Sequence, residues 1–194
     1  MPPQVTSEIA TRDGYWYKQE YIINELSLNS VFTTPNHGDT LPIADNIDKT
    51  WEVGGYAHTG GGRMVTRVEV TTDMGETWDV AAIDRRERPN EYGMYWCWVW
   101  WTFDLNVADL VGCEEIWVRA WDDANNPQPL EPTWTLMGQN LNHIFRVKVH
   151  TDTTATGDKV FRFEHPTQPG QQTGGWATRR AAKYRSAGYG RVEL

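Results

Sequence analysis

The sequence predicts an all-β fold in which two sheets pack face to face. Short segments with apolar residues at alternate positions recur along the chain, and clusters of turn-forming residues separate them. No segment carries the apolar stripe, at intervals of three and four residues, that marks an amphipathic helix. With 194 residues, the chain fits one domain of about 150 residues with extensions. The expected architecture is an immunoglobulin-like β-sandwich of E-set type, with an extended N-terminal lead-in and a flexible C-terminal tail.

Changes in composition mark the ends of this domain. Residues 1–14 are polar and aperiodic, which predicts a disordered N-terminus. Residues 15–35 have neither helical nor strand periodicity, and we interpret them as an extended lead-in segment that stops at a proline. The sandwich is expected over residues 36–176. Residues 177–194 are expected to form a linker or tail.

The first clear strand follows the lead-in. Val68 and Val70 are expected to face a core while Glu69 faces solvent, because successive side chains of a strand point to opposite sides. A turn is predicted over residues 73–76, and the alternation resumes over residues 77–80. This pattern predicts a hairpin.

The segment Tyr95–Phe103 predicts a strand that is apolar on both faces. One face is formed by Trp96, Trp98 and Trp100. The other face is formed by Cys97, Val99 and Trp101. A strand of this kind is expected at the centre of a structure, covered on both sides.

Two further strands are predicted toward the C-terminus. Their inward-facing residues alternate with charged or aromatic ones, and these inward residues are Ile116, Val118 and Ala120, then Phe145, Val147 and Val149. The glycine-rich segment Gly60–Gly62 lacks the spacing and the Lys-Ser/Thr pair of a phosphate-binding loop, so a hairpin loop is the preferred interpretation.

The net charge and the N-terminal sequence bear on which partners the protein binds and on where it is located. The net charge of −8 and the isoelectric point of about 5.1 disfavour binding to nucleic acid or to an anionic membrane. The N-terminus lacks the basic start and apolar stretch of a signal peptide, and no apolar run approaches the roughly 20 residues of a membrane span. These features predict a cytoplasmic protein. The basic residues between positions 179 and 191 are interpreted as a solvated tail.

The residue types that commonly bind metals or perform catalysis are scattered along the chain and form no local cluster. No two of the five histidines are three or four positions apart, which disfavours a local metal cluster. Cys97 and Cys113 are interpreted as small buried thiols in a reducing compartment. Asp122 and Asp123 are expected to point to opposite faces of a strand, where Asp122 forms local hydrogen bonds with Arg119 and Asn126 instead of acting in acid–base catalysis. The sequence therefore gives no catalytic and no metal-binding residue.

Three segments in a fixed order carry a resemblance to a known family. They are Arg119–Pro129, which reads RAWDDANNPQP, then Trp134–Gly138, which reads WTLMG, and finally the segment Phe161–Gly170. Over about residues 15–176, the chain resembles the C-terminal dimerisation domain of the molybdenum portion of eukaryotic (fungal and plant-type) assimilatory nitrate reductases, within the sulfite oxidase superfamily. Sulfite oxidases share the first pattern but have arginine at the position of Met137.

The resemblance implies a role for two residues of the second segment. Thr135 and Met137 match substrate-binding positions of nitrate reductases. If the segment is a strand, residues two apart point the same way and both side chains face one pocket. The resemblance therefore places nitrate at this boundary of the domain.

The resemblance also implies partners and cofactors. It implies a homodimer that completes a substrate pocket together with a molybdenum-binding domain of the same enzyme. That domain holds the molybdenum-molybdopterin cofactor, while haem and FAD belong to further domains. This chain alone is expected to bind no cofactor and to catalyse no reaction.

Two alternatives to a nitrate reductase domain are considered. One is the corresponding domain of a sulfite oxidase-type molybdenum enzyme. The other is a free-standing immunoglobulin-like module for carbohydrate or protein, because exposed indoles stack on sugar faces and the chain has 11 tryptophans. Core packing or a subunit interface is preferred for these tryptophans, and self-association through an aromatic surface is predicted.

Overall fold

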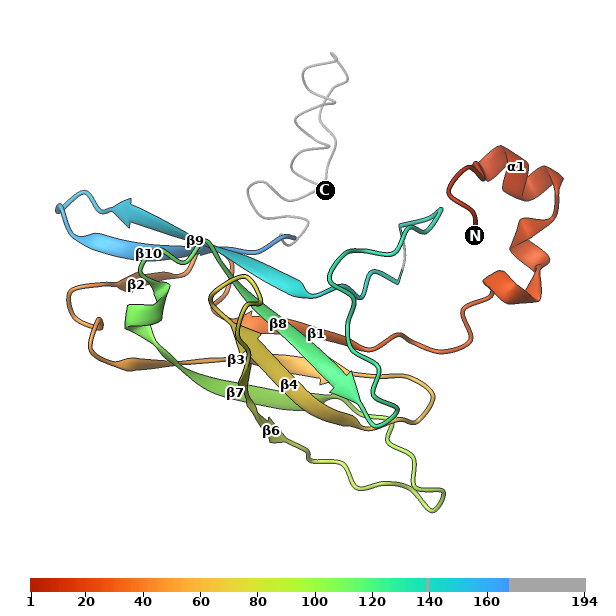
Figure 1. Ribbon diagram of the computed structural model, residues 1–194, viewed down its shortest axis with the longest axis horizontal. Helices are drawn as coiled ribbons and strands as arrows, with labels where there is room; N and C mark the ends of the chain where they lie inside the picture. The colour runs from red at the N-terminus through yellow and green to blue at the C-terminus, as the bar shows by residue number, and fades with distance from the viewer. Residues whose placement is uncertain (139, 168–194) are drawn as a thin grey trace, which may run out of the picture.

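The computed structural model describes residues 1–138 and 140–167 and is a sandwich of two antiparallel sheets (Figure 1). The four-stranded sheet has the order β1-β3-β7-β6 and the six-stranded sheet the order β2-β10-β9-β8-β4-β5. The strands of the first sheet are β1 (Asn29–Thr34), β3 (Thr50–His58), β7 (Val99–Asn106) and β6 (Ala82–Asp84). Those of the second are β2 (Thr40–Pro42), β10 (Lys159–Glu164), β9 (Phe145–Thr153), β8 (Glu115–Asp122), β4 (Val65–Thr71) and β5 (Asp79–Val80). The predicted all-β sandwich is confirmed.

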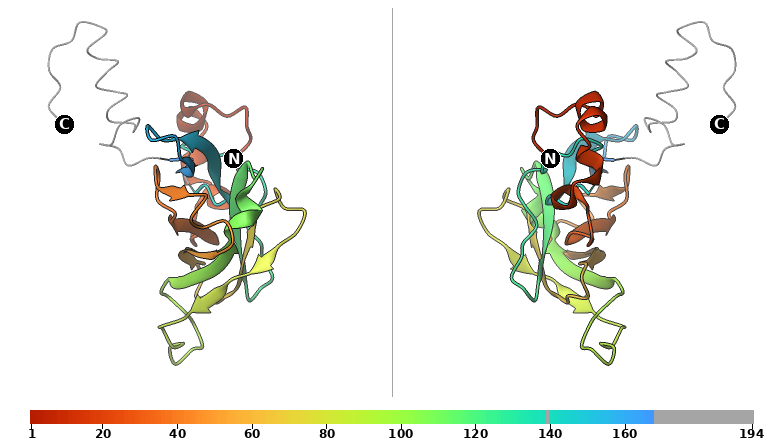
Figure 2. Two further views of the ribbon diagram at one scale, coloured as in Figure 1. Left: turned by 90° about the vertical axis from the view of Figure 1, so that its left-hand side faces the viewer. Right: turned by 90° about the vertical axis from the view of Figure 1, so that its right-hand side faces the viewer.

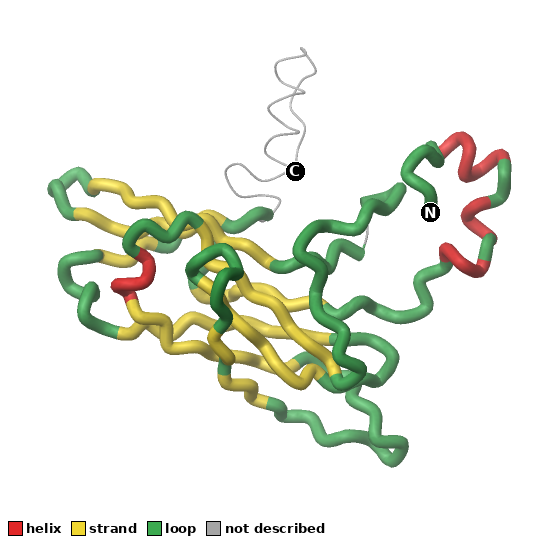
Figure 3. Tube along the Cα trace, in the orientation of Figure 1, coloured by secondary structure: helices red, strands yellow, loops and turns green. Residues whose placement is uncertain are grey.

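In the part of the chain that the structure describes, helical elements occur in the N-terminal segment and in one turn after β7 (Figure 3). These elements are α1 (Ser7–Arg12), the 3-10 turns η1 (Tyr15–Tyr17) and η2 (Gln19–Tyr21), and η3 (Val107–Leu110). Figure 1 shows that the N-terminal elements stand off one end of the sandwich, and in the two end-on views of Figure 2 they lie behind the strands on the left and in front of them on the right. Among the described residues, no helix is long and apolar enough to cross a membrane.

The core lies between the two sheets and consists of the alternating residues that the sequence indicates. Val68 and Val70 of β4 are 0% and 1% exposed. The other predicted inward residues are also buried or half-buried: Ile116, Val118, Ala120, Phe145, Val147 and Val149. From the opposite sheet, Trp101 is 1% exposed and packs edge-to-face on Phe32, with ring centroids 5.1 Å apart. Burial of these side chains is the main stabilising contribution to the fold.

The prediction that the tryptophan-rich strand is covered on both faces is wrong for the single chain. Regular pairing begins at Val99, so the segment from Tyr95 to Trp98 precedes β7. Val99 and Trp101 are buried, but Trp96, Trp98 and Trp100 are 62%, 50% and 45% exposed. The sheet that contains β7 has a core on only one side, so its outer face is open.

The N-terminal predictions require two corrections. Residues 7–12 form α1, capped where the Ile9 N–H donates to Thr6 Oγ1 at 3.3 Å, so this part of the expected disordered segment is helical. The expected lead-in contains two 3-10 turns, and its last residues form β1, which pairs with β3. The sheet therefore begins at Asn29, before the expected domain boundary. The tail at 177–194, with its basic residues, lies outside the described residues.

Three local predictions also differ from the structure. The segment Gly60–Gly62 joins β3 to β4 and so passes between the sheets, whereas a hairpin loop would join paired strands. Glu69 points away from the core but is only 7% exposed, because arginine and tryptophan side chains cover it. Cys97 is exposed, which contradicts the interpretation of two buried thiols. Cys113 is half-buried, and desolvation raises its pKa to about 11.

Candidate functional site

Thr135 and Met137 lie in a loop between β8 and β9, not in a strand as the sequence suggested. The Gly138 N–H donates to the Thr135 carbonyl at 3.2 Å, which closes a tight turn over the residues between them. Gly138 has a φ of +64°, a left-handed conformation that favours glycine. Despite this different backbone, both side chains line one cavity of about 540 Å³.

The N-terminal segment supplies the opposite wall of this cavity. Its lining includes aromatic and aliphatic residues of η1, η2 and the following stretch: Tyr15, Trp16, Tyr21, Ile22 and Ile23. Trp134 and Leu136 contribute from the loop. Several of these side chains are well exposed in the single chain, and Met137 itself is 60% exposed. The cavity is therefore an open, largely apolar recess at one end of the sandwich.

The electrostatics of this recess are unsuited to binding an anion without help. Among the described residues that line it, Glu20 is the one charged side chain, and neither Lys nor Arg is present. Lys18 is nearby on the same segment, but its ammonium group lies over the Tyr15 ring, 3.6 Å from the centroid. A second body with basic groups would have to complete a site for a negatively charged substrate.

Hydrogen bonds tie the loop to the segment that precedes β1. Asn140 Nδ2 donates to Ser27 Oγ at 2.9 Å, and Asn142 Nδ2 donates to the Leu28 carbonyl at 3.2 Å. In the opposite direction, Asn29 Nδ2 donates to the Leu141 carbonyl at 3.4 Å. The two walls of the recess are therefore fastened to each other at their base.

Gln128 is buried beneath this base and organises it. Its side-chain carbonyl accepts from Ser30 Oγ at 2.5 Å and from the Ala120 N–H at 2.9 Å. Its amide nitrogen donates to the Asn142 and His143 carbonyls, at 3.0 and 3.1 Å. At 2% exposed, Gln128 connects β1, β8 and the end of the loop. The sequence did not identify this role, which arises because distant segments converge on one amide.

Asp122 is the second buried anchor at this end of the sandwich. As predicted, it bonds locally with Asn126, whose backbone N–H and side-chain amide donate at 2.9 and 3.0 Å. Arg119 does not take part and pairs instead with Glu69 at 2.6 Å. In its place, Arg63 Nε donates to Asp122 Oδ2 at 3.0 Å and Arg63 Nη1 to Glu25 Oε2 at 2.8 Å. Arg63 thereby connects the N-terminal segment to β8.

The pKa of Asp122 reflects two opposing influences. Burial alone would raise the pKa of this carboxyl. The hydrogen bonds from Asn126 and the Ala124 N–H, together with the charge of Arg63, outweigh that effect and hold the pKa below its ordinary value. Asp122 is therefore ionised at neutral pH and serves as a structural anion. Asp123, on the other side, is exposed and accepts from the Met64 N–H at 3.1 Å.

The histidines and cysteines occupy separate places. His58 stacks on Trp98, His150 pairs with Glu164, and His165 Nε2 donates to the Pro35 carbonyl. Within residues 1–138 and 140–167, no three His, Cys, Asp or Glu side chains are arranged to hold a metal ion. This donor set does not fit a molybdenum site, and no reaction step through a metal is assigned to these residues.

Comparison with known proteins gives a consistent result. A family model described as the Mo-co oxidoreductase dimerisation domain matches residues 20–152. The chain is similar to a nitrate reductase [NADH] of Lotus japonicus, with 52% identity over 177 residues, or 91% of this chain and 20% of the relative.

Other plant proteins show the same partial coverage. Nitrate reductase [NADH] 2 of Arabidopsis thaliana is 48% identical over 188 residues, which are 96% of this chain and 20% of the relative. Nitrate reductase [NADH] of Hordeum vulgare is 48% identical over 180 residues, or 92% and 20% of the two chains. The chain thus spans about a fifth of the length of the curated relatives it matches.

Proposed function

The chain belongs to the family of Mo-co oxidoreductase dimerisation domains, and on this basis we propose that it is the dimerisation domain of a nitrate reductase. In the proposed enzyme it forms a homodimer and completes the substrate pocket of a molybdenum-binding domain. The proposal that this chain completes the substrate pocket rests on the open recess lined by Thr135 and Met137. The relatives, of which this chain matches about a fifth, are named nitrate reductases.

The proposed contribution of this chain is to bind and orient nitrate. Thr135 supplies a hydroxyl, and Met137 supplies a neutral, polarizable side chain at the rim of the recess. The basic side chains that an anion needs come, in this proposal, from the molybdenum-binding domain, because the described lining has neither Lys nor Arg. Because the described wall of the recess adds no Lys or Arg side chain, the complete site has less positive charge, which suits a monovalent anion better than a divalent one.

The cofactors of the proposed enzyme belong to its other domains. Molybdenum-molybdopterin supplies the oxygen-atom and electron chemistry when it is bound to the molybdenum-binding domain, and haem and FAD supply electrons from further domains. The role of this chain is to hold the recess in place against that domain through Gln128 and Asp122. The proposed enzyme acts in the cytoplasm.

Met137 favours nitrate reductase over the sulfite oxidase-type alternative. A divalent anion such as sulfite is better served by an arginine, which can form two parallel hydrogen bonds. A neutral thioether at this position provides no such bonds. The free-standing carbohydrate module has no comparable support, because the family match spans residues 20–152.

Co-expression tests the proposal. The molybdenum-binding domain of the parent enzyme is produced alone and together with this chain, and molybdenum content and nitrate reduction by a reduced viologen dye are measured. We expect nitrate turnover per molybdenum to rise strongly when this chain is present. The proposal fails if turnover per molybdenum is the same with and without the chain.

A further inference from the structure

The outer face of the four-stranded sheet carries a rigid aromatic ridge formed by Tyr56, Trp98 and Trp100. Tyr56 pairs directly with Trp100 across β3 and β7. Its ring lies 4.3 Å from the Trp98 ring and 5.9 Å from the Trp100 ring, measured between centroids. His58 stacks on the other side of Trp98 at 4.9 Å. Because each ring supports the next, about half of each indole is presented to solvent without being free to collapse.

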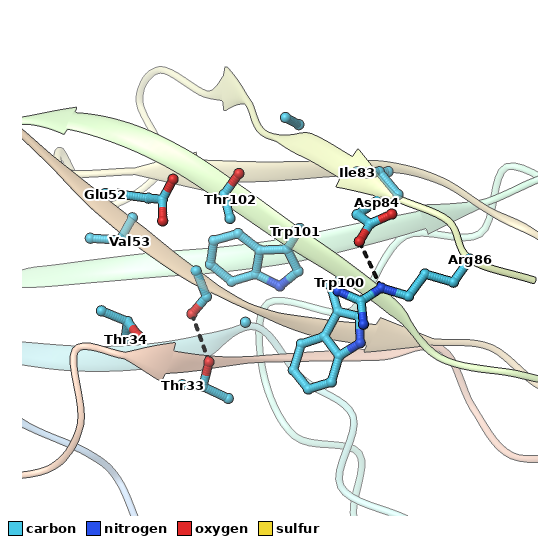
Figure 4. Close-up of a pocket in the computed structure, with 13 residues that line it drawn as sticks. Thr33, Thr34, Glu52, Val53, Ile83, Asp84, Arg86, Trp100, Trp101 and Thr102 are labelled. Atoms are coloured by element: carbon cyan, nitrogen blue, oxygen red, sulfur yellow. Dashed lines mark hydrogen bonds and ion pairs between the residues drawn. The ribbon is translucent and has the colours of Figure 1, made fainter.

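A groove of about 390 Å³ lies beside this ridge on the same face (Figure 4). Its floor is a row of small residues on three adjacent strands, since Gly54 pairs with Thr102 and Thr102 pairs with Ala82. Gly54 has no room for a larger side chain without a shift, because a Cβ there would lie 2.9 Å from the Trp101 carbonyl. The face therefore combines a protruding indole, that of Trp100, with the groove, whose floor begins at Thr102, the next residue of β7 on the same face.

A face that carries a ridge beside a groove suits contact with a second copy of itself. In an isologous dimer the same patch meets itself, so a ridge and a groove side by side can fit each other twice. Figure 4 shows Arg86 and Glu52 at opposite ends of the groove. A two-fold axis in the plane of the interface can bring Arg86 of one copy close to Glu52 of the other. Arg86 already pairs with Asp84 at 2.8 Å in an exposed position, where it is accessible to a second carboxylate.

The outer face of the six-stranded sheet lacks this open character. Its indoles are covered by guanidinium groups, with Arg119 3.8 Å from the Trp78 ring centroid and Arg146 4.5 Å from that of Trp117. Arg67 lies 4.6 Å from the Trp121 centroid. Glu69 neutralises this ladder by accepting from Arg119 at 2.6 Å and pairing with Arg67 at 2.8 Å. Within residues 1–138 and 140–167, side chains of the chain itself cover one outer face and leave the indoles of the other exposed.

We propose that the outer face of the four-stranded sheet is the homodimer interface, in which Trp100 of each copy inserts into the groove of the other copy. This inference rests on the proposed dimerising function and names the surface that performs it. A second copy is the occupant that the observations favour, because the family is described as a dimerisation domain and one face carries both a protruding indole and a groove. Trp and other aromatic side chains are also enriched at the energetic centres of protein interfaces.

Sedimentation velocity of the 194-residue chain tests the proposal. Trp100→Glu removes the ridge, and Ala82→Glu places a charge in the groove at an exposed edge position. Val80→Glu is the matched control, because Val80 is an exposed apolar strand residue of the other sheet, 64% exposed. Each of the first two variants is expected to weaken the dimer by at least about thirtyfold in Kd, and the control is expected to leave it unchanged. Circular dichroism establishes that each variant is folded. If Trp100→Glu does not fold, Ala82→Glu alone decides.

The outcomes separate this inference from the proposed function. If the chain dimerises and the folded face variants remain dimeric, or if Val80→Glu also dissociates, the interface is elsewhere and the dimerising function stands. If the wild-type chain is monomeric at tens of micromolar, the interface is refuted. In that case, the oligomeric state of the parent enzyme decides the dimerising function independently.

Discussion

Gln128 and Ser30 are 98 positions apart in the chain, yet the Ser30 hydroxyl donates to the Gln128 side-chain carbonyl at 2.5 Å, and both side chains are buried. This bond joins the first strand of one sheet to the loop that leaves β8 in the other sheet. Two further bonds, donated by the Gln128 side-chain nitrogen, go to the end of the loop that carries Thr135 and Met137. The position of the candidate site therefore depends on one buried amide.

Gln128→Leu is expected to destabilise the chain by about 2–4 kcal/mol, because it leaves the Ser30 hydroxyl and the Ala120 N–H without their partner in a buried place. Urea denaturation measures the change. Gln19→Leu, at an exposed position, is the control and is expected to shift stability by less than about 0.5 kcal/mol. Equal stability of the two variants would show that the Gln128 network contributes nothing.

Asp122→Asn is expected to alter stability at neutral pH and also its dependence on pH. The folded pKa of Asp122 is lowered, so its stabilising effect is fully present above the unfolded pKa of about 3.9 and is lost as the pH falls through the folded pKa. Removing the charge should cost about 2 kcal/mol at pH 7, because Arg63 loses its buried partner. Denaturation curves between pH 7 and pH 2.5 check both effects. Wild type and variant should converge below pH 4, and parallel curves would contradict the assignment.

Arg119→Lys tests the ladder on the six-stranded sheet. The Arg119 guanidinium both stacks on Trp78 and bonds Glu69, and an ammonium group cannot do both. The expected loss is about 1–2 kcal/mol in thermal or urea unfolding. Arg162→Lys is the matched control, since Arg162 forms a half-exposed pair with Asp152 that should contribute little. A larger effect at Arg162 than at Arg119 would contradict this interpretation.

The strands were predictable wherever one face meets the core. Val68, Val70 and Ile116 follow a period of two, and burial of that face is what the period encodes. The sequence did not reveal that the tryptophans before and within β7 are exposed. An apolar outer face gives the same sequence pattern whether its own chain covers it or leaves it open. The change of sheet between β3 and β4 leaves no local mark in the sequence, so the glycine-rich segment Gly60–Gly62 has the pattern of a hairpin loop.

The candidate site was predictable only through the resemblance. Local pattern placed Thr135 and Met137 on a strand, whereas a turn stabilised by Gly138 brings them to one recess. The anchors that hold this recess were partly accessible: Asp122 and Asn126 are close in sequence, but Arg63 and Gln128 act across more than one element. No periodicity reports such long-range polar contacts.

Thr135→Val examines the hydroxyl beside Met137 in the parent enzyme. If the hydroxyl bonds nitrate or a water at the substrate, its loss should raise KM or lower kcat by roughly tenfold, or about 1.4 kcal/mol. Steady-state kinetics at matched molybdenum content provide the measurement. A threonine with a purely structural role would instead lower the melting temperature and leave both constants unchanged.

The most direct test is Met137→Arg in the parent enzyme, with nitrate reduction and sulfite binding compared at equal molybdenum content. Because Met137 is 60% exposed in the recess, the arginine should be tolerated and the protein should remain folded and loaded with cofactor. The account predicts weaker nitrate turnover and tighter sulfite binding, because an added positive charge changes the affinity for a divalent anion more than that for a monovalent one. A soluble, fully loaded variant with unchanged nitrate kinetics and no gain in sulfite binding would remove Met137 from the substrate site and contradict the account.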